Sequence, residues 1–146
     1  MTKKKIIVLS IFAAVILCIA TVCVSVLIYK NSFSKISPDK VEKVVVWVDG
    51  PTKDKELNIE ETEALIKMYN GSKYAGNGKG DGGTPQVQAI VYFTDGSVLR
   101  ISEFGLIDRD IEVTLRSKNG IVKRWFYLNN QELLDYLTSF RAQGEK

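Results

Sequence analysis

The 146-residue chain contains no histidine, only two cysteines and three prolines. Without histidine the chain has no Ser-His-Asp triad, it lacks the commonest ligand of zinc sites, and it has no ordinary general base near neutral pH. Both cysteines, Cys18 and Cys23, fall inside one apolar run, so the rest of the chain cannot form a disulfide or use a thiolate. These absences favour a protein that is not an enzyme and has no cofactor and no metal.

The chain has little excess charge of either sign. It carries 20 Lys and Arg against 17 Asp and Glu, and three of the bases are Lys3, Lys4 and Lys5 at the start. All the acids follow Lys30, so the part after that residue is formally neutral. The basic balance therefore reflects the N-terminus, and we expect no nucleic acid partner.

One apolar run, Ile6 to Ile28, contains no charged residue. As a helix it would be roughly 35 Å long, enough to cross a hydrocarbon layer of about 30 Å. With the lysines before it, the run predicts a transmembrane signal anchor over residues 6–29, in contact with the lipid bilayer. Residues 1–5 would be a cytoplasmic basic tail and the C-terminal domain would be extracytoplasmic, in a single-pass protein of the cell membrane. The run is too long for the usual cleaved signal peptide.

The rest of the chain is the right size for one domain. Residues 30–40 are short, polar and interrupted by Pro38, which predicts a juxtamembrane linker. Residues 41–140 would form an extracytoplasmic domain with its own core. Residues 141–146 are expected to fray.

The first half of this domain predicts a strand and a helix. Residues 42–48 are rich in valine with one tryptophan, and their unbroken apolar character predicts a strand buried on both faces or central in the sheet. A charged loop, 52–56, follows. Asn58 and Glu61 have the capping-box spacing, and apolar residues then recur at helical intervals, so we predict a helix over Ile59–Asn70.

A glycine-rich stretch, 71–86, is interpreted as a flexible loop. A phosphate-binding loop would place Ser or Thr after Lys79, where Gly80 stands instead. A calcium loop needs more oxygen ligands than Asn77 and Asp81 offer.

Two hairpins are predicted next. The first joins 87–93 to 97–103 through a three-residue loop, Thr94-Asp95-Gly96, with glycine in the left-handed position. The second joins 111–116 to 121–128 through a two-residue turn, Asn119-Gly120. The core-facing residues of the first hairpin would be Ala89, Val91, Phe93, Leu99 and Ile101. The core-facing residues of the second hairpin would be Ile111, Val113, Leu115, Val122, Phe126 and Leu128. Arg124 would be an outlier on the same face, at the margin of the sheet.

The chain ends with a predicted helix over Asn130–Phe140, for which Asn129 would be the cap and Leu128 with Leu133 the hydrophobic staple. The expected fold is α+β: a transmembrane helix, then a β-α-β-β-β-β-α domain with a mainly antiparallel sheet and two helices on one face.

Carboxylates are one alternative source of chemistry. Asp108 and Asp110, with Asp95, could serve a carboxylate- or serine-dependent envelope hydrolase. Their more ordinary interpretation is that they lie in turns, where aspartate is common.

The sheet face away from the predicted core offers a better candidate site. There the hairpin registers place aromatic side chains among basic ones, a combination that can anchor a protein interface. The candidate partner-binding residues are Tyr92, Arg100, Arg116, Lys123, Trp125 and Tyr127. We expect this face to be at least partly exposed.

This layout of a lysine-rich start, one span, a short linker and a small α+β domain resembles uncharacterised single-span extracytoplasmic proteins of Gram-positive bacteria. The resemblance implies no activity. The leading hypothesis is a membrane-anchored binding or accessory domain at the cell envelope, whose partner would be an envelope protein or a cell-wall ligand. An inhibitor or immunity-type protein that occludes a partner is the second hypothesis, and the hydrolase is the third.

Overall fold

The computed structural model describes residues 3–30, 33–50, 54–78, 84–103 and 110–144. The chain divides into two compact units, residues 1–33 and residues 34–146. The first unit contains helix α1 (Lys3–Lys30), whose described side chains, from Ile11 to Val26, are all exposed.

The predicted membrane anchor is not supported. Within the residues that the structure describes, no helix is both long enough and apolar enough to span a bilayer. This finding corrects the predicted transmembrane segment over 6–29, together with the single-pass cell membrane location and the signal anchor.

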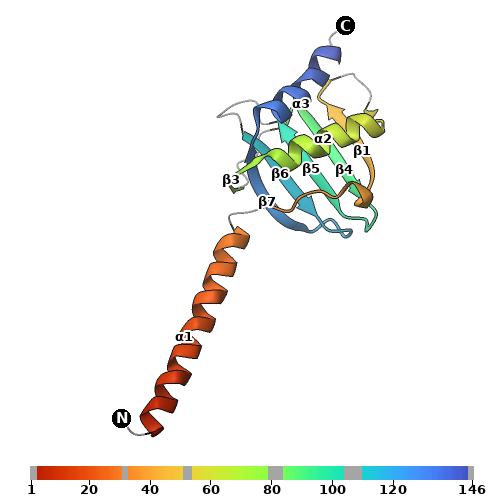
Figure 1. Ribbon diagram of the computed structural model, residues 1–146. Helices are drawn as coiled ribbons and strands as arrows, with labels where there is room; N and C mark the ends of the chain where they lie inside the picture. The colour runs from red at the N-terminus through yellow and green to blue at the C-terminus, as the bar shows by residue number, and fades with distance from the viewer. Residues whose placement is uncertain (1–2, 31–32, 51–53, 79–83, 104–109, 145–146) are drawn as a thin grey trace. The chain divides into compact units, whose positions relative to one another are not determined.

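The second unit is an α+β domain, as predicted (Figure 1). Its described strands form one seven-stranded antiparallel sheet in the order β2-β1-β4-β5-β6-β7-β3. The strands are β1 (Val41–Val48), β2 (Lys55–Glu56), β3 (Lys73–Asn77), β4 (Val87–Phe93), β5 (Val98–Glu103), β6 (Asp110–Arg116) and β7 (Val122–Asn129). A 3-10 turn, η1 (Pro38–Lys40), precedes β1, and the helices are α2 (Ile59–Gly71) and α3 (Gln131–Gly144).

Both helices lie over the same face of the sheet (Figure 1). The core fills the space between them and alternate residues of the strands, because successive strand side chains point to opposite faces. The sheet residues buried to 4% exposure or less on this face are Val44, Val46, Val87, Ala89, Val91, Leu99, Ile101, Ile111, Val113, Phe126 and Leu128. The helices contribute Leu65, Ile66, Tyr69, Leu133 and Leu137 to the same core.

The first hairpin has the predicted loop. Phe93 N–H donates to Ser97 O at 3.0 Å, Gly96 N–H donates to Phe93 O at 2.9 Å, and Gly96 has a φ of 78°. The pairs Ala89 with Ile101 and Val91 with Leu99 follow from this loop. The predicted register between β4 and β5 is therefore confirmed.

The two-residue turn predicted for the second hairpin is wrong. Ser117 and Gly120, which has a φ of 78°, close the same three-residue loop as in the first hairpin, with Ser117 N–H donating to Ile121 O at 2.8 Å. A bulge at Lys123 then restores the predicted pairing, so that Leu115 faces Arg124. The bulge turns Val122 away from the core, and its side chain is 42% exposed.

Other element boundaries also differ from the predictions. The charged loop over 52–56 contains the short strand β2, and the glycine-rich stretch begins with strand β3, which pairs with β7. The cap of α3 is Asn130 rather than Asn129, since Asn130 Oδ1 accepts Leu133 N–H at 3.2 Å. The predicted staple between Leu128 and Leu133 is therefore wrong by one position, and α3 continues to Gly144 where fraying was expected.

The predicted capping box of α2 is confirmed. Glu61 N–H donates to Asn58 Oδ1 at 2.9 Å, and Asn58 N–H donates to Glu61 Oε2 at 3.0 Å. Each bond satisfies a backbone donor near the helix N-terminus, where there is no intrahelical acceptor.

Candidate binding face of the sheet

The face of the sheet opposite α2 and α3 carries the candidate residues. Directly paired residues of antiparallel strands point to the same side, so the pairings place these side chains in three rows across the sheet. The rows are Lys43–Tyr92–Val98–Arg116–Val122, Glu56–Val45–Ile90–Arg100–Thr114–Trp125, and Trp47–Gln88–Ser102–Glu112–Tyr127. We call this surface the uncovered face.

The structure brings five of the six predicted site residues together on the uncovered face. Tyr92 and Arg116 share the first row, and Arg100 and Trp125 share the second. Tyr127 is in the third row, beside Glu112. Whether these residues bind a partner stays a prediction.

Lys123 is separated from the other candidates. It is the extra residue of the β7 bulge and has no direct partner on β6. Its ammonium group lies toward the end of the sheet, where it helps to lower the pKa of Asp95. Its side chain is exposed, so it extends the positive charge toward the hairpin loops.

The aromatic side chains of this face are half-buried. Tyr92, Trp125 and Tyr127 all have intermediate exposure, whereas Arg100 is exposed. Gly78 lies against the indole of Trp125, and its N–H donates to Trp125 O at 2.9 Å. The indole therefore has one side fixed by the backbone after β3.

Strand β1 adds residues that the sequence interpretation missed. Its apolar run was expected to be buried on both faces or central in the sheet. The strand lies between β2 and β4, but Val45 and Trp47 are half-buried and Lys43 is exposed. The Lys43 ammonium nitrogen lies 5.4 Å from the centroid of the Tyr92 ring, within cation–π range. No local signal separates the half-buried Val45 from the buried Val44 and Val46, since all three are valines.

Glu112 is one of two carboxylates in these rows, and the other is Glu56 of β2, which pairs with Val45. Burial raises the pKa of Glu112 above its usual range, and the neighbouring Trp125 indole opposes part of this rise. Among the described residues, Glu112 Oε2 and Trp125 Nε1 are buried polar atoms without a hydrogen-bond partner.

Charge on the uncovered face is mainly positive. The bases are Lys43, Arg100 and Arg116 in the rows and Lys123 at the bulge, and the acids are the exposed Glu56 and the half-buried Glu112. Arg116 Nε is buried without a partner among the described residues, and its Nη1 donates to Gly120 O at 3.4 Å. This arrangement suits contact with an acidic surface.

Of the three alternative acids, only Asp95 has a described side chain. Asp95 Oδ1 accepts both the N–H and the hydroxyl of Ser97, at 2.8 and 2.6 Å, and the Ser97 hydroxyl is the main cause of its lowered pKa. Asp108 and the side chain of Asp110 lie outside the described residues. Within the regions described, no three Asp, Glu, Cys or His residues are grouped to hold a metal.

Comparison with known proteins gives no relative for this fold or site. No family model, no curated protein and no solved structure matches the chain. A functional proposal therefore depends on the geometry described above.

Proposed function

We propose that the domain is a non-catalytic binding module whose uncovered face contacts an acidic protein partner. One observation carries the proposal: both tryptophans of the chain, Trp47 and Trp125, lie on the sheet face that α2 and α3 leave free. Two tyrosines and a set of basic side chains share that face.

The residue types fit an interface. Tryptophan, tyrosine and arginine are the side chains that contribute most often to binding energy in protein complexes. Trp125 is held on one side by Gly78, so it would lose little side-chain freedom when a partner covers it. Basic residues around the aromatics would speed encounter with an acidic partner and orient it.

An inhibitor or immunity-type protein could use the same face, because occlusion of a partner requires only tight binding. The envelope hydrolase receives no such support. Asp95 is engaged by Ser97, and the hydroxyls of Ser72 and Ser117 donate to backbone carbonyls.

The test uses a random copolymer of glutamate and tyrosine as an acidic protein-like probe. Excitation at about 295 nm selects tryptophan, so the emission reports on the uncovered face alone. We expect a saturable change in emission that weakens as salt is added, because screened charges attract less. Arg100→Glu should lower the affinity by about tenfold or more.

Lys67→Glu is the matched control, since Lys67 is an exposed base on α2, on the other side of the sheet. It should bind the copolymer as the wild type does. Equal losses in both variants would show that the copolymer responds only to net charge, and the proposal would then be abandoned.

A further inference from the structure

Positive charge on the uncovered face is concentrated at the hairpin-loop end of β5, β6 and β7. Residues 94–100 and 114–125 comprise the two hairpin loops and the adjoining parts of these strands. They contain five bases and a single acid, Asp95. Arg124 belongs to the opposite face, since its guanidinium carbon lies 5.3 Å from the centroid of the buried Phe126 ring. The other four bases are Arg100, Arg116, Lys118 and Lys123.

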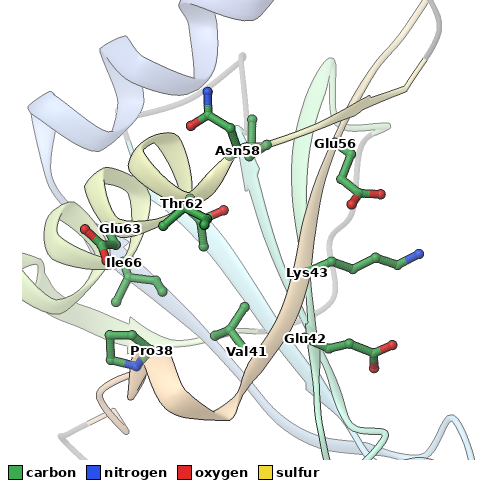
Figure 2. A pocket seen from close by; sticks show the side chains of 11 residues that line it. Pro38, Val41, Glu42, Lys43, Glu56, Asn58, Thr62, Glu63 and Ile66 are labelled. Atoms are coloured by element: carbon green, nitrogen blue, oxygen red, sulfur yellow. The ribbon is translucent and has the colours of Figure 1, made fainter.

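The opposite edge of the sheet, at β1 and β2, has the reverse balance. Residues 42–47 and 54–56 contain two lysines and three acids. The acids are Glu42, Asp54 and Glu56. Figure 2 shows Glu42 and Glu56 on the side of β1 that faces away from α2. One of the two lysines, Lys55, is already paired with Glu61. An acidic ligand is therefore attracted to β5, β6 and β7 and repelled by the β1–β2 edge.

The bases of β5, β6 and β7 are available to a ligand. Within the described residues, no ion pair within 4 Å is formed by Arg100, Arg116, Lys118 or Lys123. Arg116 Nη1 donates to Gly120 O at 3.4 Å, which directs its guanidinium group toward the second hairpin loop. Lys118 crosses to the first hairpin loop, because a Cβ added to Gly96 would lie 3.1 Å from Lys118 Cγ. Three of the four cations thus gather beside the loops.

Apolar side chains lie among these bases. Val122 pairs with Arg116 and is 42% exposed, and Ile121 before it is 67% exposed. Trp125 is half-buried in the row that contains Arg100. A ligand with an apolar residue between acidic ones would match this alternation. We call the basic corner the set Arg100, Arg116, Lys118, Lys123, Val122 and Trp125.

We propose that the basic corner binds a short segment of the acidic partner in which an apolar residue lies between acidic residues. The acids would pair with Arg100, Arg116 and Lys123, because guanidinium and ammonium groups form charge-assisted hydrogen bonds with carboxylates. The apolar residue would cover Val122 and part of the Trp125 indole. This inference rests on the proposed function, since it names the part of the uncovered face that recognises the partner and the kind of segment recognised.

The test is an NMR titration of the full chain with a blocked pentapeptide that has leucine at position 3 and glutamate at the other four positions. We expect amide shifts at residues 98–100, 114–118 and 122–125, together with a shift of the Trp125 indole N–H. Four inter-strand spacings of about 4.8 Å separate β1 from β7, so the Trp47 indole signal should stay in place. A second pentapeptide, with serine at position 3, should bind about threefold or more weakly.

Two substitutions separate the contribution of charge from that of apolar contact. K123E should weaken binding of the leucine peptide about three- to tenfold. K67E makes the same charge change at an exposed base of α2 and should bind normally. V122S should abolish the preference for leucine over serine, because the two side chains that touch would no longer both be apolar.

Equal losses in K123E and K67E, equal affinity for the two peptides, shifts at the Trp47 indole instead of Trp125, or no binding would each overturn the inference. Vesicles of phosphatidylglycerol are a second anionic probe. If they shift the signals of the basic corner and the pentapeptide does not, the corner binds lipid and the inference is wrong. If the glutamate–tyrosine copolymer binds while the pentapeptide does not, only this inference fails; if neither binds, the proposed function fails as well.

Discussion

The side-chain amide of Asn70 pairs with the backbone of Ile36 through two hydrogen bonds. Ile36 N–H donates to Asn70 Oδ1 at 2.8 Å, and Asn70 Nδ2 donates to Ile36 O at 2.8 Å. Lys35 Nζ donates to the Asn70 carbonyl, and the Ile36 side chain is buried at 5% exposure. The segment before β1 is thus fixed to α2.

Asn70→Ala should destabilise the domain by about 1–3 kcal/mol, because it leaves two part-buried backbone groups of Ile36 without partners. Chemical denaturation measures the loss, and trypsin should cleave after Lys35 faster than in the wild type. Asn129→Ala is the control, since Asn129 is exposed and should change stability by less than about 0.5 kcal/mol. An equal effect of the two substitutions would contradict this role of Asn70.

Substitution by aspartate should affect stability differently at the two asparagine caps. Asn58 uses only its side-chain oxygen at the start of α2, and a negative charge is favourable there, so Asn58→Asp should change stability by less than about 0.5 kcal/mol. Asn130 also donates through Nδ2 to Met68 O at 2.7 Å and to Ser72 Oγ at 3.1 Å. Asn130→Asp should therefore cost about 1–3 kcal/mol in thermal or chemical unfolding. Equal costs would mean that the bonds to Met68 and Ser72 contribute nothing.

Gly78→Ala should displace the Trp125 indole. An added Cβ would lie 2.2 Å from Trp125 Cδ1, far inside van der Waals contact. We expect a loss of about 1–3 kcal/mol and a shift in tryptophan emission. Gly71→Ala is the control, because nothing lies within 4 Å of its added Cβ and it ends α2 without a positive φ. That variant should be neutral or more stable by up to about 1 kcal/mol, with unchanged emission.

Because of Glu112, the free energy of unfolding and the Tm should fall as pH rises. Its pKa is raised in the folded state by burial, so the folded protein holds the proton more tightly than the unfolded chain does. The resulting stabilisation is present below the ordinary value of 4.5 and is lost as pH rises through the folded pKa. Glu112→Gln removes this dependence, so the variant should gain in Tm relative to the wild type between about pH 4 and pH 7. A Tm difference that does not change with pH would show that Glu112 is not desolvated.

Local sequence signals predicted part of the fold. The Asn58–Glu61 spacing and the Thr94-Asp95-Gly96 loop each satisfy their own backbone groups, so α2 and the first hairpin could be predicted without knowing the rest of the chain. Asn119-Gly120 was misleading, because glycine with a φ of 78° fits the three-residue loop as well as the two-residue turn. The three-residue loop differs from the two-residue turn by the bulge at Lys123. That bulge forms in the pairing of β6 with β7.

Long-range pairing accounts for the larger omissions. Strand β3 is polar and contains Gly76, and it forms because β7 supplies an edge some 50 residues later in the chain. Trp47 was missed at the candidate site because a run of valines on β1 gives no local sign of which side the helices cover. The hairpin registers, by contrast, placed Tyr92, Arg100, Arg116, Trp125 and Tyr127 on one face correctly.

The most direct test of the uncovered face as a binding surface is an NMR titration of the two indole N–H signals with the glutamate–tyrosine copolymer. Trp47 and Trp125 provide one signal each. We predict that both signals shift to saturation while the backbone amides of α2 and α3 stay in place. Shifts confined to the two helices, or no shift at either indole, would contradict the proposal that this face binds an acidic protein.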